Sequence, residues 1–151
     1  MRRILLLAAL IAIPVTAIAQ QETPPAAPST PDEFVRARQQ NMRRGGGALG
    51  MMKQTAESGG DLAALAPRIE ALTAWSRLLP TLFPEGSGTP TSGARPEIWS
   101  DRAGFEAAAA RFQTAVQGLA APAAAGDRAA FMAAWTVAHD ACSACHDAYK
   151  M

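Results

Sequence analysis

Two cysteines and a histidine close to the C-terminal end of the sequence form the motif with the clearest chemistry. Cys142 and Cys145 are separated by two residues, and His146 follows directly. Two thiols at this spacing can add to the two vinyl groups of a haem, and the adjacent imidazole can then reach the iron. The motif therefore predicts one covalently attached haem c, held by Cys142 and Cys145 with His146 as an axial ligand.

Two other uses of a cysteine pair have to be weighed against haem attachment. A thioredoxin-like redox pair requires a βαβ context, and the sequence shows no strand-like alternation. Two structural cysteines that meet this spacing by chance are the other alternative. An export signal and the position of both cysteines on an apolar helix face favour haem attachment over both.

The second axial position of the iron has to be filled from elsewhere in the chain, if it is filled at all. Five residues follow His146, so we expect any sixth ligand to come from an upstream segment. Met42 lies on the inward face of the first predicted helix, which should pack beside the last helix. Met42 is either a ligand of the iron or a methionine that packs over the distal face as part of the core.

Arg38 and Gln39 lie one turn before Met42 and are candidate partners of the haem propionates. An arginine on a core-facing position needs an anion, and its forked guanidinium suits a carboxylate. The alternative is an exposed arginine whose aliphatic stem covers the surface. Gln39 could donate a further hydrogen bond.

The first residues have the layout of a secretory signal peptide. Arg2 and Arg3 precede an apolar run, and the small-residue pattern at 17–19 predicts cleavage after Ala19. A retained membrane anchor is the alternative, although the run is short for a span. We expect a signal peptide over 1–19, a flexible linker over 20–31, a folded domain over 32–151 and a periplasmic location.

The charge balance argues against a nucleic-acid partner. Without residues 1–19 the chain carries 12 basic and 13 acidic residues, whereas a nucleic-acid-binding domain would show a strong basic excess.

Helical periodicity recurs in four segments and predicts an antiparallel four-helix bundle with haem on the C-terminal helix. The first begins near Thr30, and its Gly45–Gly47 run either breaks the helix or allows a bulky group to approach its backbone. The second follows residues 59–61, and Pro67 kinks it or marks its first turn. A long connection over 80–100 follows. We expect the third helix to be N-capped by Ser100 or Asp101 and closed by Pro122 and Gly126, and the fourth to begin near Asp127.

These motifs together resemble the class II c-type cytochromes, the cytochrome c′ family, over about residues 32–150. The likeness rests on Arg38, Gln39 and Met42, on the segment 95–100, and on residues 142–149. It implies a periplasmic bundle that is often dimeric. It also implies that Arg38 and Gln39 lie near the propionates, that the loop carrying Glu97 approaches the haem, and that Met42 occupies the distal position.

The resemblance leaves two functions open, because the family is divided at the distal position. Low-spin members bind the iron through a methionine and act as electron carriers, whereas high-spin members leave the iron open to nitric oxide or carbon monoxide. Met42 favours electron transfer with periplasmic redox proteins, with binding of these diatomic gases as the alternative. A structural role without electron exchange is a third hypothesis. No acid–base pair or activated nucleophile suggests an enzyme.

Overall fold

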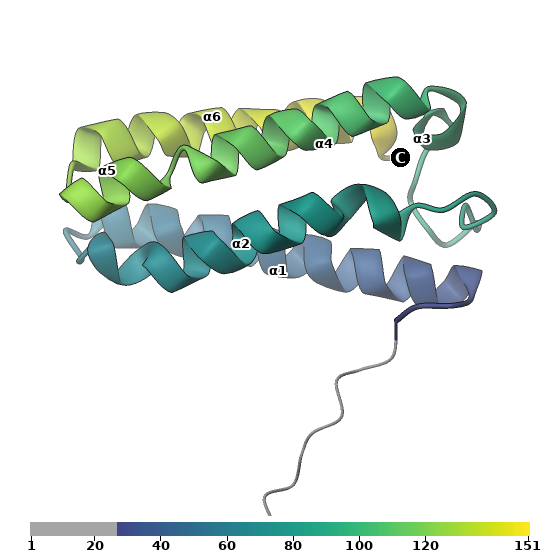
Figure 1. Ribbon diagram of the computed structural model, residues 1–151, viewed down its shortest axis with the longest axis horizontal. Coiled ribbons are helices and arrows are strands. Elements are labelled where there is room, and N and C mark those ends of the chain that lie inside the picture. The colour runs from purple at the N-terminus through teal and green to yellow at the C-terminus, as the bar shows by residue number, and fades with distance from the viewer. Residues whose placement is uncertain (1–26) are drawn as a thin grey trace, which may run out of the picture.

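The computed structural model describes residues 27–151, so the expected signal peptide and most of the expected linker lie outside the described residues. Four long helices form the molecule (Figure 1). They are α1 (Pro31–Glu57), α2 (Ala66–Leu78), α4 (Arg102–Gln117) and α6 (Arg128–Tyr149). Short helices α3 (Glu97–Ser100) and α5 (Ala120–Ala125) and 3₁₀ turns at Ala63–Leu65 and Leu79–Leu82 complete the described elements.

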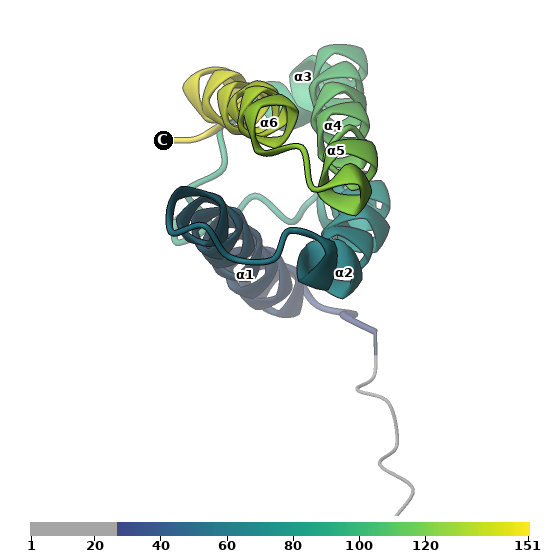
Figure 2. The same ribbon diagram turned by 90° about the vertical axis from the view of Figure 1, so that its left-hand side faces the viewer.

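The four long helices lie side by side along one axis, with α1 and α2 in one layer and α4 and α6 in the other (Figure 1). Viewed along this axis they stand at the four corners of a bundle (Figure 2). The prediction of an all-α four-helix bundle is confirmed. No helix in the described part of the chain is both long and apolar enough to span a bilayer.

Helix α1 begins where its capping residues predict. The Thr30 hydroxyl accepts from the Glu33 backbone N–H, and the Glu33 carboxylate accepts from the Thr30 N–H, which forms a capping box. Pro31 occupies the first turn, where its missing N–H costs nothing. The helix then continues unbroken through the Gly45–Gly47 run.

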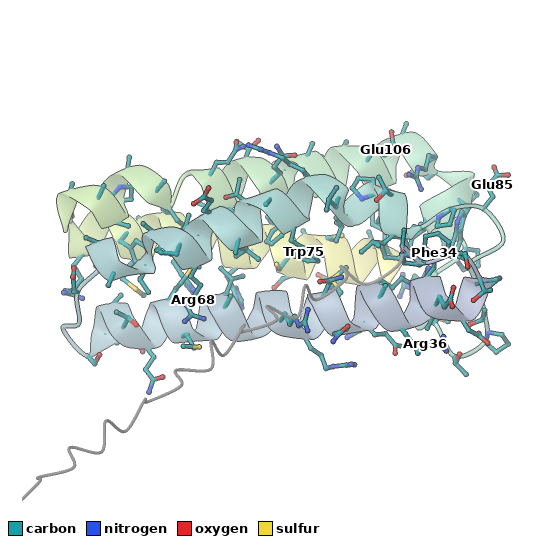
Figure 3. The ribbon with its side chains drawn as sticks, turned by 60° about the horizontal axis from the view of Figure 1, so that its bottom comes forward. Phe34, Arg36, Arg68, Trp75, Glu85 and Glu106 are labelled. Carbon is teal, nitrogen blue, oxygen red and sulfur yellow. The ribbon has the colours of Figure 1, made fainter. Side chains whose placement is uncertain are left out.

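Packing against α2 explains one glycine of the run, Gly45. A Cβ built on Gly45 would lie 3.0 Å from a ring carbon of Trp75, whereas Gly46 and Gly47 face open space. Trp75 lies between α2 and α1 (Figure 3). Of the two alternatives for the run, close approach of a bulky group is the one observed, and it applies to Gly45.

The end of the third predicted helix differs from expectation. Helix α4 begins after Asp101, whose carboxylate accepts from the Gly104 N–H, as predicted. It ends at Gln117 instead of near Pro122, and α5 follows as a separate short helix. Pro122 has no N–H to donate to the Gly118 carbonyl, so the chain turns before it and Pro122 lies in the first turn of α5. Gly126 ends α5 with φ 66°.

Pro67 lies in the first turn of α2, so the second of its two predicted roles is the observed one. The long connection before α4 is more structured than expected, since it contains α3.

The core has two parts along the bundle. The larger cluster joins α1, α2, α4 and α6 and includes Leu49, Met52, Phe112 and Phe131. A smaller cluster of Leu79, Phe83, Ile98, Phe105 and Ala109 lies at the end where the long connection and the C-terminus meet. Of the predicted functional residues, Met42 packs against this smaller cluster and Cys142 against the larger one.

Candidate haem site

A cavity of about 450 Å³ lies between the first half of α1, the C-terminal turn of α6 and the long connection. Its walls bring together residues more than 100 positions apart in sequence. They include Gln39, Met42, Arg43, Phe83, Gly93, Ile98, Phe105, Cys145, His146, Tyr149 and Lys150. The cavity therefore brings predicted residues of α1 together with Cys145 and His146 of α6.

Helix α6 supplies the cysteine and histidine side of the cavity. Cys145 and His146 line it, and the half-buried Cys142 packs against the larger core cluster. Burial and then the neighbouring Cys145 raise the pKa of the Cys142 thiol to about 11. Burial also raises the pKa of Cys145, against the effect of Arg111. Both sulfurs are thus protonated at neutral pH in the protein without haem.

The imidazole of His146 is held in the form that binds iron. Desolvation and then the Lys150 ammonium lower the pKa of His146, while Asp147 opposes them. A neutral imidazole nitrogen is the ligand that iron takes from histidine.

Helix α1 supplies a second wall of the cavity. Gln39, Met42 and Arg43 line the cavity, and Met42 is half-buried against the smaller core cluster. Met42 and His146 thus line the same cavity from two different helices, and the expected position of Met42 over the distal face of the haem stays a prediction.

Arg38 is 2% exposed and binds the long connection. Its guanidinium donates to the Ser87 hydroxyl at 3.0 Å, to the Ser87 carbonyl at 2.5 Å and to the Leu82 carbonyl at 3.4 Å. It also stands over the Phe83 ring, 4.7 Å from the centroid. Its Nε is buried and has no protein partner among the described residues. Burial lowers the pKa of Arg38, although an arginine stays charged at neutral pH.

Gln39 and Glu97 differ in their relation to the cavity. Gln39 lines it and donates from Nε2 to the Thr91 carbonyl at 3.1 Å. Glu97 is exposed in the first turn of α3 and does not line the cavity. Its expected approach to haem stays a prediction.

The sequence did not identify the residues that hold the long connection in place. Trp99 Nε1 donates to the Pro84 carbonyl at 2.9 Å, and Arg102 donates to the Phe83 and Pro80 carbonyls at 2.9 and 3.0 Å. The length of the connection was the only sequence signal, since long loops in compact domains are often functional.

The C-terminal turn is also fastened to this connection. The Arg95 N–H donates to the Tyr149 carbonyl, and the Met151 N–H donates to the Gly93 carbonyl, each at 3.0 Å. The Tyr149 hydroxyl donates to the Asp101 carboxylate at 3.1 Å. These contacts fix the third wall of the cavity relative to α6.

The residues present fit a haem. The cavity offers one apolar wall, an imidazole, a methionine and a thiol, and a second thiol lies one turn away on α6. The unpartnered Nε of the buried Arg38 at this cavity is a donor suited to a propionate carboxylate. Arg38 and Gln39 are the side chains that would hold propionates, and Cys142, Cys145 and His146 are those that would hold the ring and its iron.

Known proteins resemble the chain along almost all of its described length. The sequence profile of the family described as Cytochrome C′ matches residues 33–150. A cytochrome c′ of Rhodospirillum rubrum is 31% identical over 99% of both chains. One of Alcaligenes xylosoxydans xylosoxydans is 41% identical over 90 residues, which cover 60% of this chain and 69% of that protein.

Solved structures agree with the sequence comparisons. The recombinant native cytochrome c prime from Alcaligenes xylosoxidans matches with a TM-score of 0.75 and 32% identity, over 82% of this chain and 98% of that one. Cytochrome c′ from Rubrivivax gelatinosus matches with a TM-score of 0.73 and 32% identity, over the same shares. Among the matching structures are nitric oxide complexes of two variants of the Alcaligenes protein. The chain belongs to the cytochrome c′ family of class II c-type cytochromes, non-enzymatic haem proteins that carry one covalently bound haem c.

Proposed function

We propose that this cytochrome is a periplasmic electron carrier in which His146 and Met42 bind the two faces of the haem iron, and Cys142 and Cys145 form the thioether bonds. The observation that supports the proposal is that Met42, from α1, and His146, from α6, both line one cavity. A haem iron supplies one-electron redox chemistry when it is bound. The protein supplies the axial ligands, buries the ring and limits the access of small molecules to the iron.

Met42 decides between electron transfer and gas binding. A methionine thioether on the sixth position raises the reduction potential and leaves no site for a small ligand. A Met42 that only packs over the distal face would leave that site open. Met42 is half-buried, packs against the smaller core cluster and lines the cavity, which supports a position over the distal face of the haem.

Binding of diatomic gases is the second candidate function. It is favoured by the nitric oxide complexes of two variants of the related Alcaligenes protein. For this chain it requires that Met42 leaves the iron, or never binds it.

Carbon monoxide binding to the ferrous holoprotein separates the two functions. We expect a low-spin spectrum that carbon monoxide does not change, because the sixth position is taken. Met42→Ala should convert the protein into a high-spin form that binds carbon monoxide. Met51→Ala is the matched control, since Met51 lies on the same helix but is exposed and remote from the cavity. A wild-type protein that binds carbon monoxide readily as a high-spin species would reject electron transfer in favour of gas binding.

A further inference from the structure

The charges of the described chain are strongly separated. Residues 34–56, within α1, contain five basic residues and no aspartate or glutamate, whereas the rest of the described chain contains seven basic and twelve acidic residues. A near-neutral protein thus carries a concentrated positive field along one helix. Fields of this kind act on association with charged partners.

Three of these basic residues have no protein partner. Arg38 is engaged by the long connection, and Lys53 pairs with Glu57 at 3.6 Å. Arg36, Arg43 and Arg44 form no ion pair and no side-chain hydrogen bond within residues 27–151. All three are exposed. We call them the arginine face of α1.

The arginine face reaches the haem cavity through Arg43. Arg43, on α1, and Lys150, at the end of α6, both line this cavity. Arg36 lies two helical turns before Arg43, on the side of α1 turned away from the other helices (Figure 3). One of the three unpaired arginines, Arg43, therefore lies at the cavity that would hold the haem, and the other two lie on the same half of α1.

We propose that the arginine face is the surface through which an acidic redox protein approaches the haem. This inference rests on the proposed electron-carrier function. Exposed guanidinium groups attract carboxylates over about one Debye length and orient the partner before contact. A partner steered in this way reaches the cavity mouth with its own negative surface against Arg43. Electron exchange needs such an edge-to-edge approach, which favours a protein partner over a lipid surface.

The hexacyanoferrate(III) trianion tests the field at the cavity mouth in the intact holoprotein. The ferrous protein gives one electron to the oxidant, which becomes hexacyanoferrate(II). We expect the second-order rate constant to fall steeply as ionic strength rises. The variant Arg43→Gln/Arg44→Gln should react about tenfold more slowly at low ionic strength and lose most of the salt dependence. With the hexaammineruthenium(III) trication as oxidant, the same variant should react faster than wild type.

A second double variant with the same change of net charge is the control. Arg68→Gln/Arg77→Gln removes two exposed arginines of α2 that do not line the haem cavity. It should behave nearly as wild type with both oxidants. Equal effects of the two double variants would show that only net charge matters and would overturn the proposal.

Poly-L-glutamate tests occupation by an acidic polypeptide. It should slow the hexacyanoferrate reaction of wild type and of the α2 variant, but not that of the Arg43/Arg44 variant. Two outcomes would reassign the arginine face. Sedimentation with phosphatidylglycerol vesicles that depends on Arg43 and Arg44, without the oxidant effect, would assign it to lipid. Salt-sensitive self-association lost in the same variant would assign it to a second copy of this chain.

Failure of this inference is distinguishable from failure of the proposed function. Outer-sphere oxidation proceeds whether or not Met42 binds the iron, so the charge dependence is measured independently of the carbon monoxide result. A wild-type protein that binds carbon monoxide but shows the predicted salt dependence would reject the electron-carrier function. The electrostatic effect of the arginine face on oxidants would still stand. A low-spin wild type without that dependence would reject the arginine face alone.

Discussion

Arg38 joins two parts of the molecule through one side chain. Three of its contacts hold the long connection against α1, and its buried Nε remains available at the haem cavity. A buried guanidinium that donates to carbonyl groups leaves those groups unsatisfied when it is removed. The residue therefore bears on stability as well as on the expected propionate contact.

Arg38→Met should lower the free energy of unfolding of the holoprotein by about 2 kcal/mol or more, because hydrogen bonds from a charged group are lost and the Ser87 carbonyl is left buried. Denaturant titration measures this change. Arg36→Met, an exposed change two residues away, should stay within about 0.5 kcal/mol of wild type. Equal effects of the two substitutions would show that the Arg38 contacts contribute nothing measurable.

Individual residues were predictable from the sequence where chemistry fixes their spacing. Cys142, Cys145 and His146 have the spacing that haem attachment requires, and all three lie near the C-terminal end of α6. The partners of Arg38 were not predictable. Ser87 lies 49 residues away in an irregular segment, and no periodicity in the sequence relates the two.

Helix α1 has a capping box at its start and four internal glycines, of which only Gly45 lies close to a neighbouring side chain. Gly45 lies against Trp75, and the Trp75 ring is in turn packed edge-on to Phe112 at 6.0 Å. Gly47 faces open space and is exposed. The helix therefore carries a cost at Gly47 that the packing does not explain.

Gly47→Ala should raise the free energy of unfolding by about 0.5–1 kcal/mol, since alanine is the better helix former and its methyl group meets nothing. Gly45→Ala should gain clearly less or lose stability, because its methyl group would press on the Trp75 ring, which packs edge-on against Phe112. Thermal and denaturant unfolding compare the two variants. An equal gain from both would mean that Trp75 moves aside freely.

Helix starts were easier to predict than helix ends. Thr30, Asp101 and Asp127 are side-chain caps with a local signature, and the structure has all three. The break between α4 and α5 comes from a carbonyl that Pro122 cannot satisfy, four residues before the proline itself. The apolar periodicity of this segment continues to Leu119, beyond the end of α4 at Gln117, so the sequence pattern does not reveal the break.

The whole molecule consists of a continuous core at one end and a cavity at the other. The larger cluster has its own packing across α1, α2, α4 and α6, whereas the smaller cluster borders the haem cavity. A ligand that binds the folded state alone stabilises it. Here that stabilisation should be concentrated at the cavity end.

A haem-free chain tests this division. The variant Cys142→Ala/Cys145→Ala should unfold at a lower temperature, and hydrogen exchange should increase mainly over residues 36–44 and 83–98. The segments around Leu49, Phe112 and Phe131 should keep most of their protection, because their contacts do not involve the cavity. A uniform loss of protection along all helices would show that the larger core cluster also depends on haem, which would contradict the prediction.

The bundle itself was predictable because four periodic apolar faces allow few other arrangements. The cavity was predictable only in part. Its two helical walls follow from the inward faces of α1 and α6, but the third wall depends on backbone contacts such as those of Gly93 and Arg95 with the C-terminal turn. Hydrogen bonds between main-chain groups leave no trace in residue type.

Ligation of the iron by Met42 is the central claim, and the methyl proton resonances of the methionines test it most directly. In the ferrous holoprotein labelled at its methionine methyl groups, a methyl group bound over the haem ring is shifted far upfield by the ring current. We predict one such resonance, absent in Met42→Leu and retained in Met51→Leu. Ordinary shifts for every methionine of the wild-type protein would contradict the claim.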